Sequence, residues 1–470
     1  DGRKRNACME YSGSRCRYAR PGSSRGSQAA TLCPESTFED LVDRKKFLFV
    51  SLDGLIADIA WQVVKEGHEV QLFIDSKSEK EIGNGFVPKT DDWEHEVEWA
   101  DVVVFDDVLG QGARAQQLRD AGRLVVGGSP YTDRLEDDRA FGQQELKAAG
   151  VPIIPQDNFT SFDDAIAFVQ ANPNRYVIKP SGEAQHPKQL LFVGGDEDGK
   201  DVIQVLEDYK RAWAARIKEF QLQRRIVGVE VAAGAFFNGK EFVTPINVNF
   251  EHKKLFPGDI GPSTGEMGTS MFWSEPNRIF NATLKKMELK LKEERYTGYI
   301  DVNCIVNSNG IYPLEFTARF GYPTISIQQE GMLTPIGEFL HKLAEGSITR
   351  FKARSGFQVG VRIVVPPFPF TDPATFETSS KDAVIIFKKP TREGVHIEDV
   401  KTVDNEWLVT GTSGVVLIVV GLGPTMKAAQ KQVYNRIENI MIPNMYYRKD
   451  VGDRWFEDFD RLHTWGYLRD

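Results

Sequence analysis

The sequence predicts a multidomain protein of the α/β and α+β classes, with a doubly wound parallel sheet near its N-terminus and a small α+β domain near its C-terminus. Its 470 residues exceed what one hydrophobic core usually contains and suggest about two to four domains. Between residues 45 and 127, short apolar strands alternate with helical patterns, as in a parallel sheet. After about residue 346, several apolar strands are followed by a helix, which is typical of an antiparallel α+β unit.

The composition excludes several classes of function. Hydrophobic residues make up 41% of the chain and charged residues 27%, which is ordinary for a globular protein. A net charge of -9 provides no basic surface for nucleic acid, and the apolar runs are much shorter than a membrane span. The cysteines fit no zinc motif, Cys304 stands alone in the body of the chain, and no apolar signal core is present. We therefore expect a cytoplasmic protein without nucleic-acid or membrane partners.

Residues 1–40 are rich in Arg, Ser and Gly and have no apolar period. Such a segment cannot bury enough surface to offset its ordering entropy, so we expect a disordered basic tail or a cloning remnant.

The block 41–134 contains the predicted parallel sheet. The strands KKFLFVSLD, HEVQLFID, ADVVVFDD and RLVVGG are separated by helical patterns such as GLIADIAWQVVKEG. Ligands of such sheets bind beyond the carboxyl ends of the strands, where this chain has Ser51, Asp53, Asp107 and Gly127. No GxGxxG follows the first strand, so a dinucleotide is not favoured.

The block 135–226 begins with two polar helices and then places Lys179 at the end of the apolar strand RYVIKP. A lysine at such a position is most often a solvated edge residue. It also suits a phosphate site, because the polar loop SGEAQHPKQ follows and could close over a nucleotide.

The block 227–350 begins with a hairpin that turns at NGK and continues into EHKKLFPGDIGPSTGEMGTS. The glycines and prolines of the latter stretch predict that it has no regular element. It is then either an anion-binding loop or a surface connection. A helix is predicted from Asn277 to about Glu294.

The next stretch, YTGYIDVNCIVNSNGIYPLEF, reads as two strands joined by a turn, which places Asp301 and Glu315 on adjacent strands of one hairpin. Two neighbouring carboxylates repel unless a cation lies between them, so they either bind a divalent metal or face solvent. On this stretch alone, both interpretations stay open. Residues 351–470 form the C-terminal domain and tail.

Taken together, these blocks resemble the ATP-grasp ligases, in particular their glycinamide ribonucleotide synthetase (phosphoribosylamine–glycine ligase) branch. The motifs that carry the resemblance are EHKK…GPSTGEMGT, YTGYIDVNCIV, LEFTARFGYP and GLGPTMKAAQKQVYNRI, within a likeness from about Lys45 to Lys449. The resemblance implies a pre-ATP-grasp domain at 41–134, and a two-part ATP-grasp core made of a lid subdomain at 135–226 and a catalytic subdomain at 227–350.

The resemblance also implies roles for individual residues. Lys179 and Arg319 would be catalytic, and Arg319 suits a substrate carboxylate or an acyl phosphate because its cation is planar. Nucleotide contacts are implied for Arg139, Lys179, Lys188, Gln223, Arg225, Ile226 and Glu230. Substrate contacts are implied for Glu251, Lys253, Gly261, Thr264, Gly265, Gly268 and Arg319. The metal, Mg²⁺ or Mn²⁺ bound beside ATP, would be held by Asp301, Glu315 and Thr317.

The chain departs from the family pattern at several of these places. Thr317 stands where members carry Asn, and RFGYPT replaces RFGDPE, so Tyr322 and Thr324 take the places of two acids. Arg139 and Gln223 replace a lysine and an acid. At the N-terminal end, SLDGLIAD replaces a glycine-rich NGGRE loop, and no arginine remains there.

The function implied is therefore ATP-dependent joining of a small-molecule carboxylate to an amine through an acyl phosphate, as in purine biosynthesis, with the family's substrates or an altered pair. A monomer or a homodimer is expected. The alternative is a catalytically degenerate homologue that serves as a binding or structural subunit.

Overall fold

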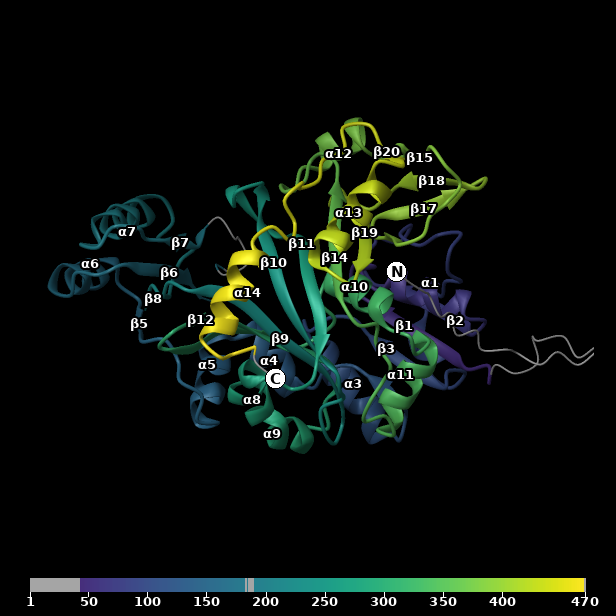
Figure 1. Cartoon of the computed structure of the whole chain (residues 1–470), viewed down its shortest axis with the longest axis horizontal. Coiled ribbons are helices and arrows are strands. Elements are labelled where there is room, and N and C mark those ends of the chain that lie inside the picture. The colour runs from purple at the N-terminus through teal and green to yellow at the C-terminus, as the bar shows by residue number, and fades with distance from the viewer. Residues whose placement is uncertain (1–42, 182–183, 185–189, 469–470) are drawn as a thin grey trace, which may run out of the picture. The chain divides into compact units, whose positions relative to one another are not determined.

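The N-terminal strands form a parallel four-stranded sheet in the order β2-β1-β3-β4 (Figure 1). The computed structural model describes residues 43–181, 184 and 190–468. The predictions for the tail at 1–40 and for Lys188 lie outside these residues. The elements of this part are β1 (Lys46–Ser51), α1 (Ala57–Lys65), β2 (Glu69–Ile74), α2 (Trp93–Glu96), β3 (Val102–Phe105), α3 (Gln111–Asp120), β4 (Val125–Val126) and α4 (Pro130–Asp137). The predicted parallel sheet is confirmed.

A second, antiparallel sheet carries Lys179 at the end of its strand β6. The order is β5-β8-β6-β7, with α6 and α7 packed on it around a separate apolar core (Figure 1). Its elements follow α5 (Arg139–Ala148) and are β5 (Gln156–Phe159), α6 (Phe162–Ala171), β6 (Tyr176–Pro180), β7 (Phe192–Val193), α7 (Lys200–Ala212) and β8 (Phe220–Arg224).

The largest sheet has eight strands in the order β13-β12-β9-β10-β11-β14-β19-β16, and its neighbouring strands are antiparallel. Its strands are β9 (Val229–Asn238), β10 (Ile246–Phe256), β11 (Ile260–Ser274), β12 (Thr297–Asn307), β13 (Gly310–Thr317), β14 (Phe357–Val364), β16 (Val395–Ile397) and β19 (Val415–Gly423). The predicted hairpins at NGK and SNG are both present as the β9–β10 and β12–β13 pairs.

The prediction that EHKKLFPGDIGPSTGEMGTS has no regular element is wrong. The stretch belongs to β10 and β11, which pair with two register shifts, between His252 and Lys254 and between Lys254 and Phe256. These bulges accommodate the glycines, because extra residues on one strand relax the pairing there. Gly261 takes a positive φ of 82°, which favours glycine over other residues.

The predicted helix from Asn277 to Glu294 is also wrong as a single element. It is broken into α8 (Arg278–Ala282), a 3₁₀ turn (Leu284–Met287) and α9 (Glu288–Glu293). The break lies at Thr283, whose φ of -124° and ψ of -91° are not helical and whose hydroxyl donates to the carbonyl of Ile279. A threonine that bonds back to the preceding turn competes with the helical ladder.

The C-terminal part is antiparallel, as expected, but its strands are divided between two sheets. β14, β16 and β19 complete the eight-stranded sheet, and a small sheet has the order β17-β18-β15-β20. The remaining elements are α10 (Thr324–Gly331), α11 (Ile336–Glu345), α12 (Pro373–Ser379), β15 (Val384–Phe387), β17 (Val400–Val403), β18 (Glu406–Val409), α13 (Met426–Ile437), β20 (Ile440–Met441) and α14 (Trp455–Thr464). From residue 44 to residue 468, the described residues form one compact unit. The domain boundaries given above stay predictions.

No helix in the described part of the chain is both long and apolar enough to cross a membrane.

Candidate active site

The β12–β13 hairpin presents a row of oxygen-bearing side chains from alternate positions. In the observed register, Asp301 lies opposite Thr317 and Asn303 lies opposite Glu315. Residues two apart on a strand share a face, so these four side chains line one side of the hairpin. The predicted pair Asp301 and Glu315 is therefore on adjacent strands but diagonal, and Asn303 is the direct neighbour of Glu315.

Asn303 was missed in the sequence, although the period of two in YIDVNCIV places it on the face of Asp301. It is 5% exposed, and its Nδ2 donates to Oε2 of Glu251 over 3.2 Å. Its Oδ1 finds no hydrogen-bond partner within the described part of the chain. A buried amide oxygen without a partner is costly and points to a ligand, because it can accept a hydrogen bond or coordinate a cation.

Asp301 is buried and accepts a hydrogen bond from the Tyr299 hydroxyl at 3.1 Å. Burial and the neighbouring Glu251 carboxylate raise the pKa of Asp301 to about 8. No three or more His, Cys, Asp or Glu side chains of the described residues gather closely enough to hold a metal alone. The donors nevertheless fit magnesium, which takes one or two protein carboxylates and fills its shell with phosphate and water.

Two cations approach this acidic face from other elements. Lys179, at the end of β6, is 7% exposed, and burial together with Arg139 lowers its pKa to about 8. Arg139, the first residue of α5, places Nη2 3.6 Å from Oε2 of Glu315. The charges of Glu315 and Glu230 act in the opposite direction and raise the pKa of Lys179. The structure therefore brings these four predicted residues together.

Lys253 on β10 lies among the acids of the same site. Its Nζ is 2.8 Å from Oε1 of Glu230, 3.3 Å from Oε2 of Glu251 and 3.9 Å from Oε1 of Glu315. The ion pair with Lys253 lowers the pKa of Glu230. The predicted nucleotide residue Glu230 and the predicted metal residue Glu315 are thus joined by one ammonium group.

The predicted adenine hinge follows β8. Gln223 is buried and donates to the side chain of Gln156 over 3.3 Å, while Arg225 donates to the carbonyl of Gly194 over 2.8 Å. Ile226 is half-buried and follows Arg225 directly. The amide of Gln223 can donate and accept hydrogen bonds, which suits a base edge.

The predicted substrate glycines lie on β11. Thr264 donates its hydroxyl to the backbone carbonyl of Lys253 over 2.9 Å, which fixes the two strands together beside the acids. Gly265 is exposed. A Cβ at Gly268 would come within 2.6 Å of the carbonyl of Gly360, so this glycine permits the close approach of β14, and Gly261 lies at the hairpin turn.

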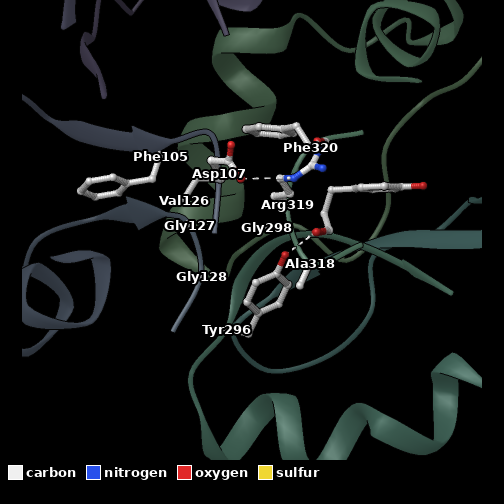
Figure 2. Close-up of a pocket in the computed structure, with 11 residues that line it drawn as sticks. Phe105, Asp107, Val126, Gly127, Gly128, Tyr296, Gly298, Ala318, Arg319 and Phe320 are labelled. Carbon is white, nitrogen blue, oxygen red and sulfur yellow. Dashed lines mark hydrogen bonds and ion pairs between the residues drawn. The ribbon is translucent and has the colours of Figure 1, made fainter. Parts of the chain in front are cut away.

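Arg319 lines a pocket between the strand ends of β3 and β4 and the start of β12 (Figure 2). Its Nε is 3.4 Å from Oδ1 of Asp107, its Nη2 is 3.1 Å from Oε1 of Glu136, and its Nη1 donates to the carbonyl of Phe320. Burial alone would lower the pKa of Arg319, but Glu136 and Asp107 raise it, so the guanidinium remains charged. Glu136 gave no signal in the sequence, because it lies in the polar helix α4.

The carboxyl ends of β1 and β3 bring further acids to this region. The hydroxyl of Ser51 donates to Oδ2 of Asp106, and burial followed by the nearby Asp107 raises the pKa of Asp106 to about 7. Burial and Asp107 also raise the pKa of Asp53. The strand ends at residues 51–54, 106–108 and 127–129 contain no Lys or Arg.

One supporting residue was not foreseen at all. Arg454, just before α14, donates to the backbone carbonyl of Glu251 over 2.8 Å and to that of Glu230 over 2.7 Å. α14 itself lies against β9 and β12 (Figure 1). Arg454 lies about 200 positions from both acids, and no pattern in the sequence indicates that contact.

Comparison with known proteins identifies a family that matches this chain. The family model described as the phosphoribosylglycinamide synthetase ATP-grasp (A) domain matches residues 137–325, and the model of the C domain of the same synthetase matches residues 374–454. Together the two models match more than half of the chain.

Several curated relatives carry the name phosphoribosylamine–glycine ligase. The protein of Halalkalibacterium halodurans is 25% identical over 353 residues, which are 72% of this chain and 78% of that one. The protein of Ralstonia nicotianae is 26% identical over 353 residues, which are 72% of this chain and 80% of that one.

Solved structures share the fold. The phosphoribosylamine–glycine ligase of Thermotoga maritima superposes with a TM-score of 0.64 at 21% identity, covering 86% of this chain and all of that one. The biotin carboxylase domain of the Hydrogenobacter thermophilus 2-oxoglutarate carboxylase, solved with MgADP and bicarbonate, has a TM-score of 0.60 at 13% identity and covers 91% of this chain and all of that one.

Proposed function

The chain belongs to the phosphoribosylglycinamide synthetase family of ATP-grasp ligases, and we propose that it joins a carboxylate to an amine at the expense of ATP. In this reaction, the carboxylate oxygen attacks the γ-phosphorus and ADP leaves. The amine then attacks the acyl carbon, and phosphate leaves with the formation of an amide. The observation that carries the proposal is the convergence of Lys179, Arg139 and Glu315 from separate elements.

The residues support this reaction by binding and orientation, since phosphoryl transfer needs positioning and charge neutralisation more than a general base. Lys179 and Arg139 supply fixed positive charge for the nucleotide phosphates. With its pKa lowered to about 8, Lys179 is still mostly protonated at pH 7, and a bound phosphate would favour the charged form further. Glu230 accepts hydrogen bonds from the ribose hydroxyls in this proposal.

Glu315, Asn303, Asp301 and Thr317 would hold the divalent cation. They fit because all four offer oxygen atoms from one face of the β12–β13 hairpin and because Oδ1 of Asn303 is buried without a partner in the described chain. When bound, Mg²⁺ neutralises phosphate charge and polarises the transferred phosphoryl group.

Arg319 would bind the carboxylate substrate. Its guanidinium is held in place by Asp107 and Glu136, and it lines the pocket shown in Figure 2. A fixed planar cation suits both a carboxylate and an acyl phosphate. The alternative of a catalytically degenerate homologue is not favoured, because Lys179 and Arg139 lie together with the acids Glu230 and Glu315.

Two classes of acceptor amine are candidates for this reaction. The names of the relatives suggest phosphoribosylamine and glycine as substrates. A second candidate has the same chemistry with an unphosphorylated, cationic amine. It is favoured by Asp53, Asp106 and Asp107, because the strand-end segments that carry these acids contain no Lys or Arg to bind a phosphate group. Arg319 lies beside them but is already paired with Asp107 and Glu136.

The compartment and the oligomeric state are also part of the proposal. We propose that the ligase acts in the cytoplasm as a monomer or a homodimer, and the free, buried Cys304 agrees with a reducing compartment.

The test is ADP release by the purified protein with magnesium and ATP, measured with glycine and phosphoribosylamine and then with panels of carboxylates and unphosphorylated amines. Mass spectrometry identifies the amide. Phosphoribosylamine-dependent ADP release supports the first candidate, and release that requires an unphosphorylated amine supports the second. If no combination stimulates ADP release although ATP binds, the chain is not a ligase.

A further inference from the structure

The ammonium group of Lys253 occupies a position where three proposed ligand-binding carboxylates meet. Its Nζ lies 2.8 Å from Glu230, 3.3 Å from Glu251 and 3.9 Å from Glu315. One ammonium group is therefore paired with all three carboxylates.

This cation neutralises the same oxygens that the nucleotide and metal would use. Lys253 faces Oε1 of Glu315, and Arg139 faces Oε2 over 3.6 Å. A divalent cation that binds Glu315 would therefore meet a like charge next to its ligand atom. Like charges about 4 Å apart repel strongly when partly buried, so a metal and Lys253 cannot both remain on Glu315 at little cost.

The local structure allows the lysine side chain to move while its backbone stays. Thr264 holds the backbone carbonyl of Lys253, and the register shift on either side of Lys254 interrupts the regular pairing of β10 with β11. The side chain of Lys253 keeps 34% of its surface exposed, which leaves it a path out of the acid cluster. The charge of Lys253 also contributes to the lowered pKa of Lys179, so the two ammonium groups are close enough for nucleotide phosphates bound by Lys179 to offer Lys253 new partners.

We propose that Lys253 is an exchangeable internal counter-ion of the metal site. In the ligand-free protein it neutralises Glu315 and Glu230, and on binding of the metal–nucleotide complex it moves from Glu315 to phosphate oxygens. The consequence is an order of binding, since a divalent cation enters with the nucleotide and not ahead of it. This inference rests on the proposed function, because that function supplies the metal and the nucleotide.

The test measures binding of Mn²⁺ by electron paramagnetic resonance, with and without ADP, and requires no turnover. The wild-type protein is expected to bind Mn²⁺ at least about tenfold more tightly with ADP than alone. Lys253→Met should strengthen binding of Mn²⁺ alone by about tenfold and reduce the gain from ADP. Lys253→Arg, which keeps the charge, should bind Mn²⁺ as the wild type does.

The matched control is Lys254→Met, because Lys254 is the next residue of β10 and makes none of the three ion pairs described for Lys253. It should leave both Mn²⁺ affinities unchanged. Thermal unfolding verifies that each variant is folded, and Lys253→Gln replaces Lys253→Met if the latter is not.

Equal Mn²⁺ affinity of the wild type with and without ADP, including no measurable binding in either case, overturns the proposal. So does a folded Lys253→Met protein whose binding of Mn²⁺ alone is unchanged. Failure of the ligase assay beside intact cooperation between Mn²⁺ and ADP would overturn only the ligase function. Turnover without that cooperation would overturn only the role of Lys253.

Discussion

At the scale of single residues, the candidate site is defined by how charges are shared. Glu315 contacts cations from two elements, Arg139 at the start of α5 and Lys253 on β10, and lies opposite the amide of Asn303. Each of these partners comes from a different segment of the chain. Glu315 is therefore the residue at which α5, β10 and the β12–β13 hairpin meet.

Glu315→Gln should lower metal-dependent ATP consumption by about 100-fold or more, because an amide keeps the shape but loses the charge that binds a divalent cation. The measurement is ADP release at saturating ATP over a range of Mg²⁺ concentrations. The fold should stay intact, since the residue is only half-buried. Unchanged activity would show that Glu315 is not a metal ligand.

Arg319→Lys should raise the KM for the carboxylate substrate by about tenfold or more, while the KM for ATP changes little. The ammonium keeps a charge near Asp107 and Glu136 but loses the planar pair of donors. Steady-state kinetics with each substrate varied in turn separate the two constants. Arg350→Lys is the control, because Arg350 pairs with the exposed Glu275. An effect confined to ATP would mean that Arg319 does not bind the carboxylate.

Part of the candidate site could be predicted because its pattern is local. A lysine at a strand end and two acids on the strands of one hairpin are visible in the sequence, and the family resemblance then implied roles for Lys179, Asp301 and Glu315. The partners of these residues could not be predicted. The contacts of Arg319 with Glu136 and of Lys253 with Glu230 depend on how distant elements pack, and no local pattern records that packing.

At the scale of elements, the site depends on two neighbouring strands staying in register. β9 carries Glu230 and β10 carries Glu251 and Lys253. The two strands pair at residues 232–234 of β9 and 247–249 of β10, away from these side chains. Arg454 connects them beyond that point through its two backbone hydrogen bonds and is itself held by Asp458 over 2.7 Å. It therefore positions acids that it does not contact through their side chains.

Arg454→Met should raise the KM for ATP by about tenfold with a smaller effect on kcat, because a charge-assisted hydrogen bond contributes about 1.5–3 kcal/mol and two would be lost. Equilibrium binding of ADP provides a second readout. Arg461→Met is the matched control on the same helix, since Arg461 is exposed and pairs with Glu457. A loss of thermal stability without any change in nucleotide affinity would assign Arg454 a structural role only.

The two wrong element predictions have different causes. In β10–β11, glycines and prolines were interpreted through their intrinsic preferences as signs of a loop, but β11 is paired on both sides, with β10 and β14. In α8–α9, one long helix was predicted, but the hydroxyl of Thr283 bonds back to the carbonyl of Ile279 and interrupts it. The strands of the N-terminal sheet were predictable because they are continuous apolar runs, as expected for parallel strands buried on both faces.

At the scale of the whole described chain, one buried charge cluster joins three segments. Nδ1 of His396, on β16, is 2.8 Å from Oδ2 of Asp58 in α1, and its Nε2 is 3.3 Å from Oε1 of Glu330 in α10. Gln329 lies against the same carboxylate and ring. N-terminal, central and C-terminal segments are therefore held together by one histidine whose charge depends on pH.

Burial alone would lower the pKa of His396, but Asp58 and Glu330 raise it to about 9. Because the folded value exceeds the unfolded value, the stabilisation is complete below pH 6.5 and is lost as the pH rises from 6.5 through 9. Asp58 and Glu330 have lowered pKa values, since His396 offsets the effect of their burial, so their stabilisation is lost only at acidic pH.

The raised pKa of His396 corresponds to about 3 kcal/mol of stabilisation at most. His396→Gln should therefore lower the melting temperature at pH 6.0 by about 3 °C. The melting temperature of the variant should also decline less than that of the wild type between pH 6.5 and 9. Differential scanning calorimetry at half-unit steps of pH measures both effects. His341→Gln is the control, because the ring of His341 pairs with the exposed Glu345 one turn further along the same helix, α11. A His396→Gln protein that keeps the wild-type decline would show that another group sets the pH dependence and that the three segments are held together without the imidazolium charge.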